Sequence, residues 1–166
     1  YRDRILFCPG YIDQSAANNL VAILLYLENS DPAKPVTLYM NIPGGDLRPS
    51  LAVADTMRSL RSKGMRINTL NLGFTAGLGA FLLSLGSPGC RLAMPNSRML
   101  LHRSGSYNGE IRGQCADVAN DVREIVRANE AVERDLAKVT GQPVSRVRKD
   151  MERRFYVDAG EAKEYG

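Results

Sequence analysis

The sequence predicts a mixed α/β domain in which short strands alternate with helices and pair mostly in parallel. Short apolar, β-branched runs alternate with segments whose apolar residues recur every three or four positions. Turn residues such as Pro9-Gly10 and Pro43-Gly44-Gly45 follow the apolar runs, as expected where a strand gives way to a helix. With 166 residues and no linker-like segment, we expect one domain covering 1–166.

The first half of the chain contains three strand–helix units. Asp13 is suited to cap a helix, because its carboxylate can accept hydrogen bonds from the first free N–H groups. The run 36–41 is rich in β-branched and aromatic residues, which favours a strand. We expect strands at 4–7, 36–41 and 66–72, and helices from Asp13 toward Pro32, from Gly45 toward Gly64, and over 76–85.

The second half begins with two short strands, 91–94 and 98–102, separated by Pro95-Asn96. A long helical pattern follows over 114–140 and ends at Gly141 and Pro143. One further helix over 144–153 and a final strand at 155–157 complete the expected elements.

The long helix carries an apolar stripe with alternating spacings of four and three residues. A helix of about 26 residues is about 39 Å long, whereas a domain of this size has a radius of gyration near 15 Å. We therefore expect the helix to project and its stripe to bind another copy or a related subunit, with Asn129 fixing the register. The alternative is that the helix packs on its own sheet. The stripe comprises Val118, Val122, Ile125, Asn129, Val132 and Leu136.

The charge distribution favours an ordinary solvated surface. Lysine and arginine total 22 against 18 acidic residues, a formal net charge of +4. The basic stretches 58–66 and 146–154 have acidic residues within or beside them, and the chain has no tryptophan. We therefore expect a solvated or subunit-facing surface and no nucleic-acid partner. The uncharged run 67–90 is rich in glycine and polar residues, so we expect a buried strand and helix and no membrane span.

Cysteine and histidine usage argues against metal and disulfide chemistry. The three cysteines, Cys8, Cys90 and Cys115, have no C-x-x-C spacing. Their odd number disfavours a disulfide framework and indicates a reducing compartment. With a single histidine, His102, most metal sites are also disfavoured. We expect no metal and no cofactor.

His102 is the residue through which Ser–His or Cys–His catalysis would have to run. It ends an expected strand, where α/β folds place their sites, although a purely structural histidine is an equal alternative. The Gly44-Gly45 turn can present backbone N–H groups to an anion, or can be a tight turn only. The glycine-rich segment 73–79 lies where a nucleophile elbow would lie, but its only hydroxyl is that of Thr75.

Six motifs, in order along the chain, carry a family resemblance: 39–45, 55–57, 73–83, 94–98, 140–143 and 158–166. With them the chain resembles the ClpP peptidase subunits of the ATP-dependent Clp protease over nearly its whole length. The resemblance implies a crotonase-like α/β spiral with a long protruding handle helix. The head would comprise 1–102 and 143–166, and the handle region 103–142. It also implies two stacked seven-membered rings, held together by the handles, around a closed chamber.

The resemblance also implies a Ser–His–Asp triad, and two of its three positions depart from the family pattern. Gly77 stands where the serine belongs, His102 is retained, and Arg154 takes the place of the acid. Glycine has no hydroxyl to form an acyl-enzyme, and a guanidinium cannot accept the ring N–H of a histidine. By resemblance, the N–H groups of Gly45 and Leu78 would remain as an oxyanion hole.

This combination is similar to the catalytically inactive ClpR branch of the family. It implies a non-catalytic subunit that shares rings with active ClpP and other ClpR subunits and is served by a hexameric AAA+ unfoldase. The expected location is the plastid (chloroplast) stroma, or the cytoplasm of a cyanobacterium. Asp46 and Pro49 would lie on the peptide-binding edge, where a proline removes a backbone donor. The stretch 102–123 also has about three residues more than active subunits have.

Two alternatives remain open. The first is an active serine peptidase with a different nucleophile, for which Ser84, Ser104 and Ser106 are the candidates and Glu152 the replacement acid. The second is a crotonase-type acyl-CoA enzyme, which would need a carboxylate near Gly45.

Overall fold

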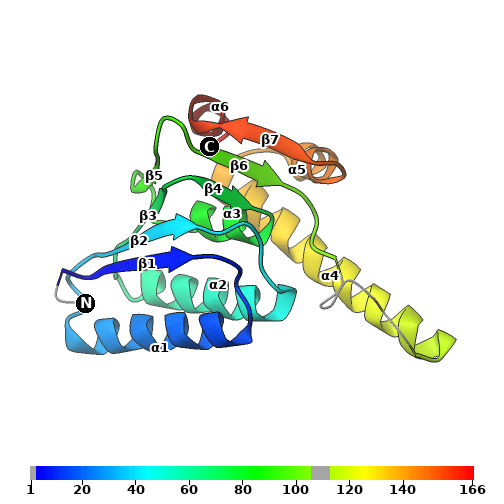
Figure 1. The fold of residues 1–166 in the computed structure, drawn as a ribbon, viewed down its shortest axis with the longest axis horizontal. Helices are drawn as coiled ribbons and strands as arrows, with labels where there is room; N and C mark the ends of the chain where they lie inside the picture. The colour runs from blue at the N-terminus through cyan, green and yellow to red at the C-terminus, as the bar shows by residue number, and fades with distance from the viewer. Residues whose placement is uncertain (1–2, 106–112) are drawn as a thin grey trace.

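A computed structural model describes residues 3–105 and 113–166 of the chain. It is a mixed α/β structure with two sheets, of four and three strands, and with one long helix that extends away from the other elements (Figure 1). The extra length expected within 102–123 falls partly on 106–112, outside the described residues.

The first sheet is parallel throughout, with the strand order β1-β2-β3-β5. Its strands are β1 (Ile5–Pro9), β2 (Val36–Asn41), β3 (Ile67–Asn71) and β5 (Arg91–Ala93). Helices α1 (Gln14–Ser30) and α2 (Leu47–Ser62) lie together on one face of this sheet (Figure 1). On the opposite face Ile5, Phe7 and Leu92 are 45%, 61% and 55% exposed. Because parallel sheets are usually covered on both faces, this face is an uncovered apolar surface of the isolated subunit.

The second sheet has the order β4-β6-β7, and Gly77 and His102 directly follow two of its strands. It consists of β4 (Phe74–Ala76), β6 (Arg98–Leu101) and β7 (Phe155–Asp158). Strand β4 was not expected from the sequence, and the helix predicted over 76–85 is the shorter α3 (Leu78–Ser84). Only three residues pair with β6 before Gly77 turns the chain into α3. A strand this short has no detectable alternation in the sequence.

The starts of α1 and α2 show how the sequence sets helix boundaries. The Asp13 carboxylate accepts from the Ala16 N–H at 2.7 Å, which confirms the predicted cap. Asp46 is the N-cap residue of α2, and Pro49 is buried in the first turn of that helix. The expectation that Pro49 removes a donor from a peptide-binding edge is therefore wrong. First-turn N–H groups have no intrahelical acceptor, so a proline is tolerated there.

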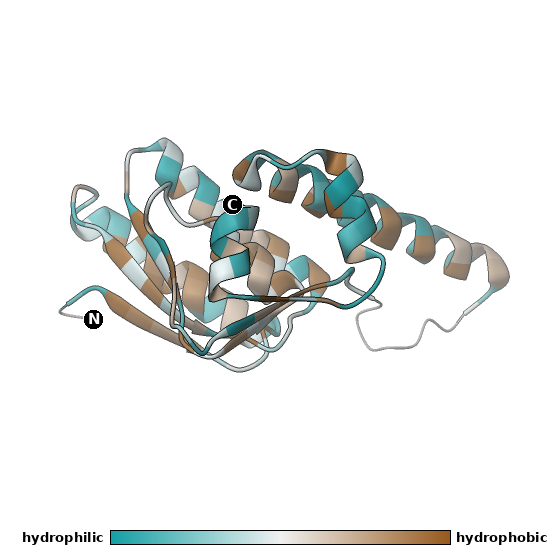
Figure 2. Ribbon diagram, turned by 90° about the horizontal axis from the view of Figure 1, so that it is seen from above, coloured by the Kyte–Doolittle hydropathy of each residue, from teal (hydrophilic) through white to brown (hydrophobic). Residues whose placement is uncertain are grey.

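The long helix α4 (Cys115–Thr140) divides into two unlike halves. Its first half projects beyond the other elements and presents alternating apolar residues along the ribbon (Figure 2). On this half Val122 and Val126 are 44% and 50% exposed. On the second half Asn129, Val132 and Leu136 are buried, with the two apolar side chains in the chain's own core. The stripe predicted to bind another subunit is thus free only toward the start of α4, and the alternative of packing on the own domain describes the rest.

The chain ends with α5 (Val144–Met151), β7 and α6 (Ala159–Tyr165). Helix α6 was not expected from the sequence. Its capping box, in which Asp158 accepts from the Glu161 N–H and Glu161 accepts from the Asp158 N–H, is the signal that predicts it.

Candidate functional site

His102 directly follows β6, at the end of the second sheet. Its Nδ1 lies 2.8 Å from the carbonyl oxygen of Arg103. Because a carbonyl oxygen only accepts, Nδ1 carries the proton in this hydrogen bond, and Nε2 is the ring atom left for another partner. A backbone carbonyl thus takes the orienting position that a carboxylate occupies in a Ser–His–Asp triad.

Gly77 lies against this ring, in the turn between β4 and α3. Its N–H donates to the carbonyl oxygen of Leu100 at 2.8 Å, which holds the turn beside β6. The backbone has φ +53° and ψ −114°, a combination open mainly to glycine. A Cβ at this position would lie 2.8 Å from Nε2 of His102 and 2.9 Å from Cε1. The imidazole therefore occupies the space that a side chain at position 77 would need.

The resemblance assigns the N–H groups of Gly45 and Leu78 to an oxyanion hole, and neither is used by the bridge or the helix to which it belongs. Ile12 donates to the Gly44 carbonyl at 3.1 Å and accepts from the Asp46 N–H at 2.9 Å. Gly45 lies between Gly44 and Asp46 in this parallel bridge. The middle residue of such a bridge directs its own N–H away from the partner strand, so the N–H of Gly45 faces away from Ile12. Leu78 is the first residue of α3, and its N–H has no acceptor within that helix.

Arg154 lines the same open cavity as His102, a space of about 540 Å³. Its walls combine apolar side chains, including Phe74 and Tyr156, with charged ones. The charged members are Glu152 and the three arginines 103, 153 and 154. The structure therefore brings together the three positions that the resemblance aligns with a triad, because Gly77 contacts His102. It also surrounds the histidine with an excess of positive charge.

A buried carboxylate beneath this cavity fixes one of the arginines. Glu133 of α4 is fully buried and pairs with Arg103 Nε at 2.8 Å and with Arg148 Nε at 3.0 Å. The hydrogen bond that Arg148 donates to Glu133 raises the pKa of the Arg148 guanidinium above its usual range. Asn129, one turn earlier on α4, holds the backbone of Ser104. The base of the long helix thereby braces the segment 103–104 that follows the histidine.

This brace was missed at the sequence level. Glu133 directly follows Val132 of the predicted stripe. A helical pattern places it beside the apolar stripe, where a charged residue is expected to be exposed to solvent. The one usable signal is Asn129, a polar residue in an otherwise apolar stripe. Its amide fixes a loop of its own chain, whereas the prediction gave it a role in register between subunits.

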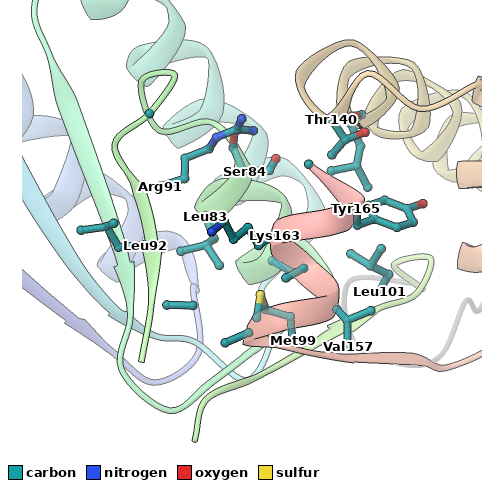
Figure 3. Close-up of a pocket in the computed structure, with 17 residues that line it drawn as sticks. Leu83, Ser84, Arg91, Leu92, Met99, Leu101, Thr140, Val157, Lys163 and Tyr165 are labelled. Carbon is teal, nitrogen blue, oxygen red and sulfur yellow. Dashed lines mark hydrogen bonds between the residues drawn. The ribbon is translucent and has the colours of Figure 1, made fainter. Parts of the chain in front are cut away.

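The alternative nucleophiles lie elsewhere or are otherwise engaged. Ser84 lines a second cavity of about 540 Å³, mostly apolar, between α3, β5 and α6, and His102 does not line it (Figure 3). Its hydroxyl donates to the Phe81 carbonyl at 2.6 Å. The backbone of Ser104 is held by Asn129, and Ser106 lies outside the described residues.

Neither a metal cluster nor a membrane-spanning helix lies in the described ranges, 3–105 and 113–166. No group of three or more His, Cys, Asp or Glu side chains is placed there to hold a metal ion. Within the same ranges, none of the helices combines the length and the apolar character that crossing a bilayer requires.

Comparison with known proteins identifies the family. The Clp protease profile matches residues 1–166. This chain belongs to the Clp protease family. It is 40% identical over 164 residues to ATP-dependent Clp protease proteolytic subunit 2 of Prochlorococcus marinus (strain NATL2A), covering 99% of this chain and 80% of that protein. The same figures hold for ATP-dependent Clp protease proteolytic subunit 3 of Synechococcus sp. (strain CC9605).

Membership of the Clp protease family confirms the resemblance inferred from the six motifs and the predicted α/β fold class. The two relatives are named as proteolytic subunits of an ATP-dependent protease. The Clp protease family thus implies a ring assembly that works with a Clp ATPase.

Proposed function

We propose that this chain is a non-catalytic, ClpR-like subunit of a Clp protease core. The observation that carries the proposal is the contact between His102 and Gly77, with the imidazole lying where a nucleophile's side chain would start. No hydroxyl at position 77 can attack a peptide carbonyl, so no acyl-enzyme can form there. Arg154, in the acid's place, cannot accept the imidazole N–H.

The exposed apolar surfaces support co-assembly. Val122 and Val126 on the projecting half of α4 suit contact with an equivalent handle of another subunit. The open face of the first sheet, with Phe7 and Leu92, is a second apolar surface. It is exposed to water in the isolated subunit and suits contact with a neighbouring subunit. We propose that the partners are active ClpP and other ClpR subunits in stacked seven-membered rings, on which an AAA+ unfoldase docks. The proposed location is the plastid stroma or a cyanobacterial cytoplasm.

The test is a fluorophosphonate serine probe applied to the purified native complex, with each labelled band identified by mass spectrometry. We expect neighbouring subunits to be labelled and this chain to remain blank. Labelling of this chain contradicts the proposal, and Ser84→Ala, Ser104→Ala and Ser106→Ala variants then locate the nucleophile.

A gain-of-function pair sharpens the test. Gly77→Ser restores a hydroxyl but leaves Arg154 beside the histidine, whereas Gly77→Ser with Arg154→Asp restores both missing groups. We expect the double variant to be labelled at least about tenfold faster than the single one, because an orienting carboxylate contributes strongly to Ser–His catalysis. Ser84→Ala with Arg154→Asp is the matched control and is expected to stay blank.

A further inference from the structure

We propose that the cavity containing His102 binds the C-terminal carboxylate of peptides that end in an apolar residue, with Arg154 as the group that pairs with the carboxylate. The inference rests on the proposed function, because peptides with a free C-terminal carboxylate are the products that active neighbours release into a shared chamber. Hydrolysis of each peptide bond creates one new C-terminal carboxylate, so this ligand class is supplied by the reaction itself.

The charges of the cavity favour an anion. Arg103 is engaged by the buried carboxylate of Glu133, at 2.8 Å, which it shares with Arg148. Arg153 and Arg154 are exposed, and within the described residues neither forms an ion pair or a side-chain hydrogen bond. Glu152 is the one acidic side chain in the lining. The guanidiniums of Arg153 and Arg154 therefore outnumber the single carboxylate of Glu152 in the lining. Guanidiniums bind carboxylates with charge-assisted, often bidentate hydrogen bonds.

The apolar walls favour a hydrophobic side chain next to that carboxylate. Phe74 on β4 and Tyr156 on β7, the two outer strands of the second sheet, line the cavity together with Pro43 and Met151. Tyr156 is 55% exposed, so its ring is available to a ligand. An inorganic anion would leave these walls unused, whereas a peptide ending in leucine or phenylalanine covers them.

The glycine at position 77 explains why this subunit would not cleave a bound peptide. In an active subunit the serine hydroxyl stands beside the histidine, whereas here the imidazole fills that space, and Nε2 has no hydroxyl to deprotonate. A bound peptide therefore meets cations and apolar walls without a nucleophile.

The test is fluorescence anisotropy on the full-length protein with a fluorescein-labelled Gly-Ala-Ala-Leu peptide that has a free carboxylate. The comparison peptides are the same sequence with a C-terminal amide and an amidated version with an internal aspartate. We expect the amide to bind about tenfold more weakly, as loss of one charge-assisted hydrogen bond implies. The internal aspartate is expected to restore less than half of that loss. Equal binding of all three peptides overturns the proposal, and full recovery by the aspartate reassigns the cavity to acidic side chains and overturns it also.

Variants separate the cavity from general charge attraction. Arg154→Ala is expected to weaken the carboxylate peptide about tenfold and to leave the amide peptide unchanged. Arg66→Ala is the matched control, since Arg66 is exposed and does not line the cavity. Because His102 is the only histidine of the chain, its imidazole NMR signals report binding at the cavity directly. Unchanged His102 signals at saturating peptide overturn the assignment. A blank chain in the probe experiment together with equal peptide affinities refutes this inference and leaves the proposed function intact.

Discussion

The side-chain amide of Asn129 forms hydrogen bonds with both the N–H and the carbonyl group of Ser104. Its Oδ1 accepts from the Ser104 N–H at 2.9 Å, and its Nδ2 donates to the Ser104 carbonyl at 2.9 Å. The same Nδ2 also donates to the carbonyl of Ile125 within α4. A buried side chain of the long helix thus satisfies the backbone of the segment that leaves the histidine, two residues after His102.

Replacing this amide is expected to loosen the segment. Asn129→Leu keeps the size of the side chain but leaves the N–H and carbonyl of Ser104 without partners, at a cost of about 1–3 kcal/mol in the free energy of unfolding. Amide hydrogen exchange is expected to show loss of protection at Ser104. Asn120→Leu, at an exposed position of the same helix, is the control and is expected to change neither quantity. Unchanged protection at Ser104 in Asn129→Leu contradicts the assignment.

The buried Glu133 is expected to contribute far more to stability than the exposed Glu130 on the same helix. Glu133→Gln places an amide N–H₂ group among guanidinium donors and removes the charge that Arg103 and Arg148 share, so we expect a loss of about 1–3 kcal/mol. Glu130→Gln alters an exposed pair at 3.9 Å and is expected to cost under about 0.5 kcal/mol. Urea unfolding measures both, and equal midpoints for the two variants would refute the brace.

The conformation and the crowding at Gly77 can be separated by a double-mutant cycle. Gly77→Ala combines the cost of its backbone conformation with the contact to the imidazole, and we expect that contact to add a further loss of about 1 kcal/mol. Gly64, with φ +94° and open space around its Cβ position, is the control for a positive φ without crowding, and Gly64→Ala is expected to cost about 1–2 kcal/mol. In a His102→Ala background that further loss is expected to disappear. An unchanged cost in that background shows that the ring does not restrict position 77.

A charge on the projecting half of α4 is expected to disrupt assembly without unfolding the subunit. Val122→Asp replaces a side chain that is already 44% exposed, so the isolated chain is expected to keep its stability within about 0.5 kcal/mol. In the reconstituted complex, native mass spectrometry is expected to show fewer stacked double rings. Asp121→Ala, at a neighbouring exposed position, is the control for surface changes on this helix. Undiminished double rings in Val122→Asp argue against a role for the stripe in assembly.

The sequence predicted the elements that are long enough to show a clear hydrophobic periodicity. The strand over 36–41 agrees with β2 in both bounds, and the 26-residue helix agrees with α4 to within one residue at its start. Strand β4 and helix α6 were missed because three and seven residues carry too little periodicity. The capping box of Asp158 and Glu161 would have identified α6.

The candidate site could be predicted only in part. The family motifs pointed to Gly77, His102 and Arg154, and the structure brings these positions together. The role of Glu133 could not be predicted, because a carboxylate in a helical pattern gives no sign that two arginines from later and earlier segments converge on it. Similarly, an unbroken stripe does not reveal that one half of a helix is covered by its own core.

The unequal burial of α4 links helix formation to subunit concentration. Its outer turns, before Ile125, rest mainly on their own backbone hydrogen bonds, and a short isolated helix is marginal in water. In the proposed assembly a neighbour that covers Val122 and Val126 would stabilise those turns, so by mass action we expect the outer turns to fray on dilution and to tighten on assembly. The inner turns are buried and paired through Glu133, so we expect them, and the surroundings of His102, to be unaffected by this change.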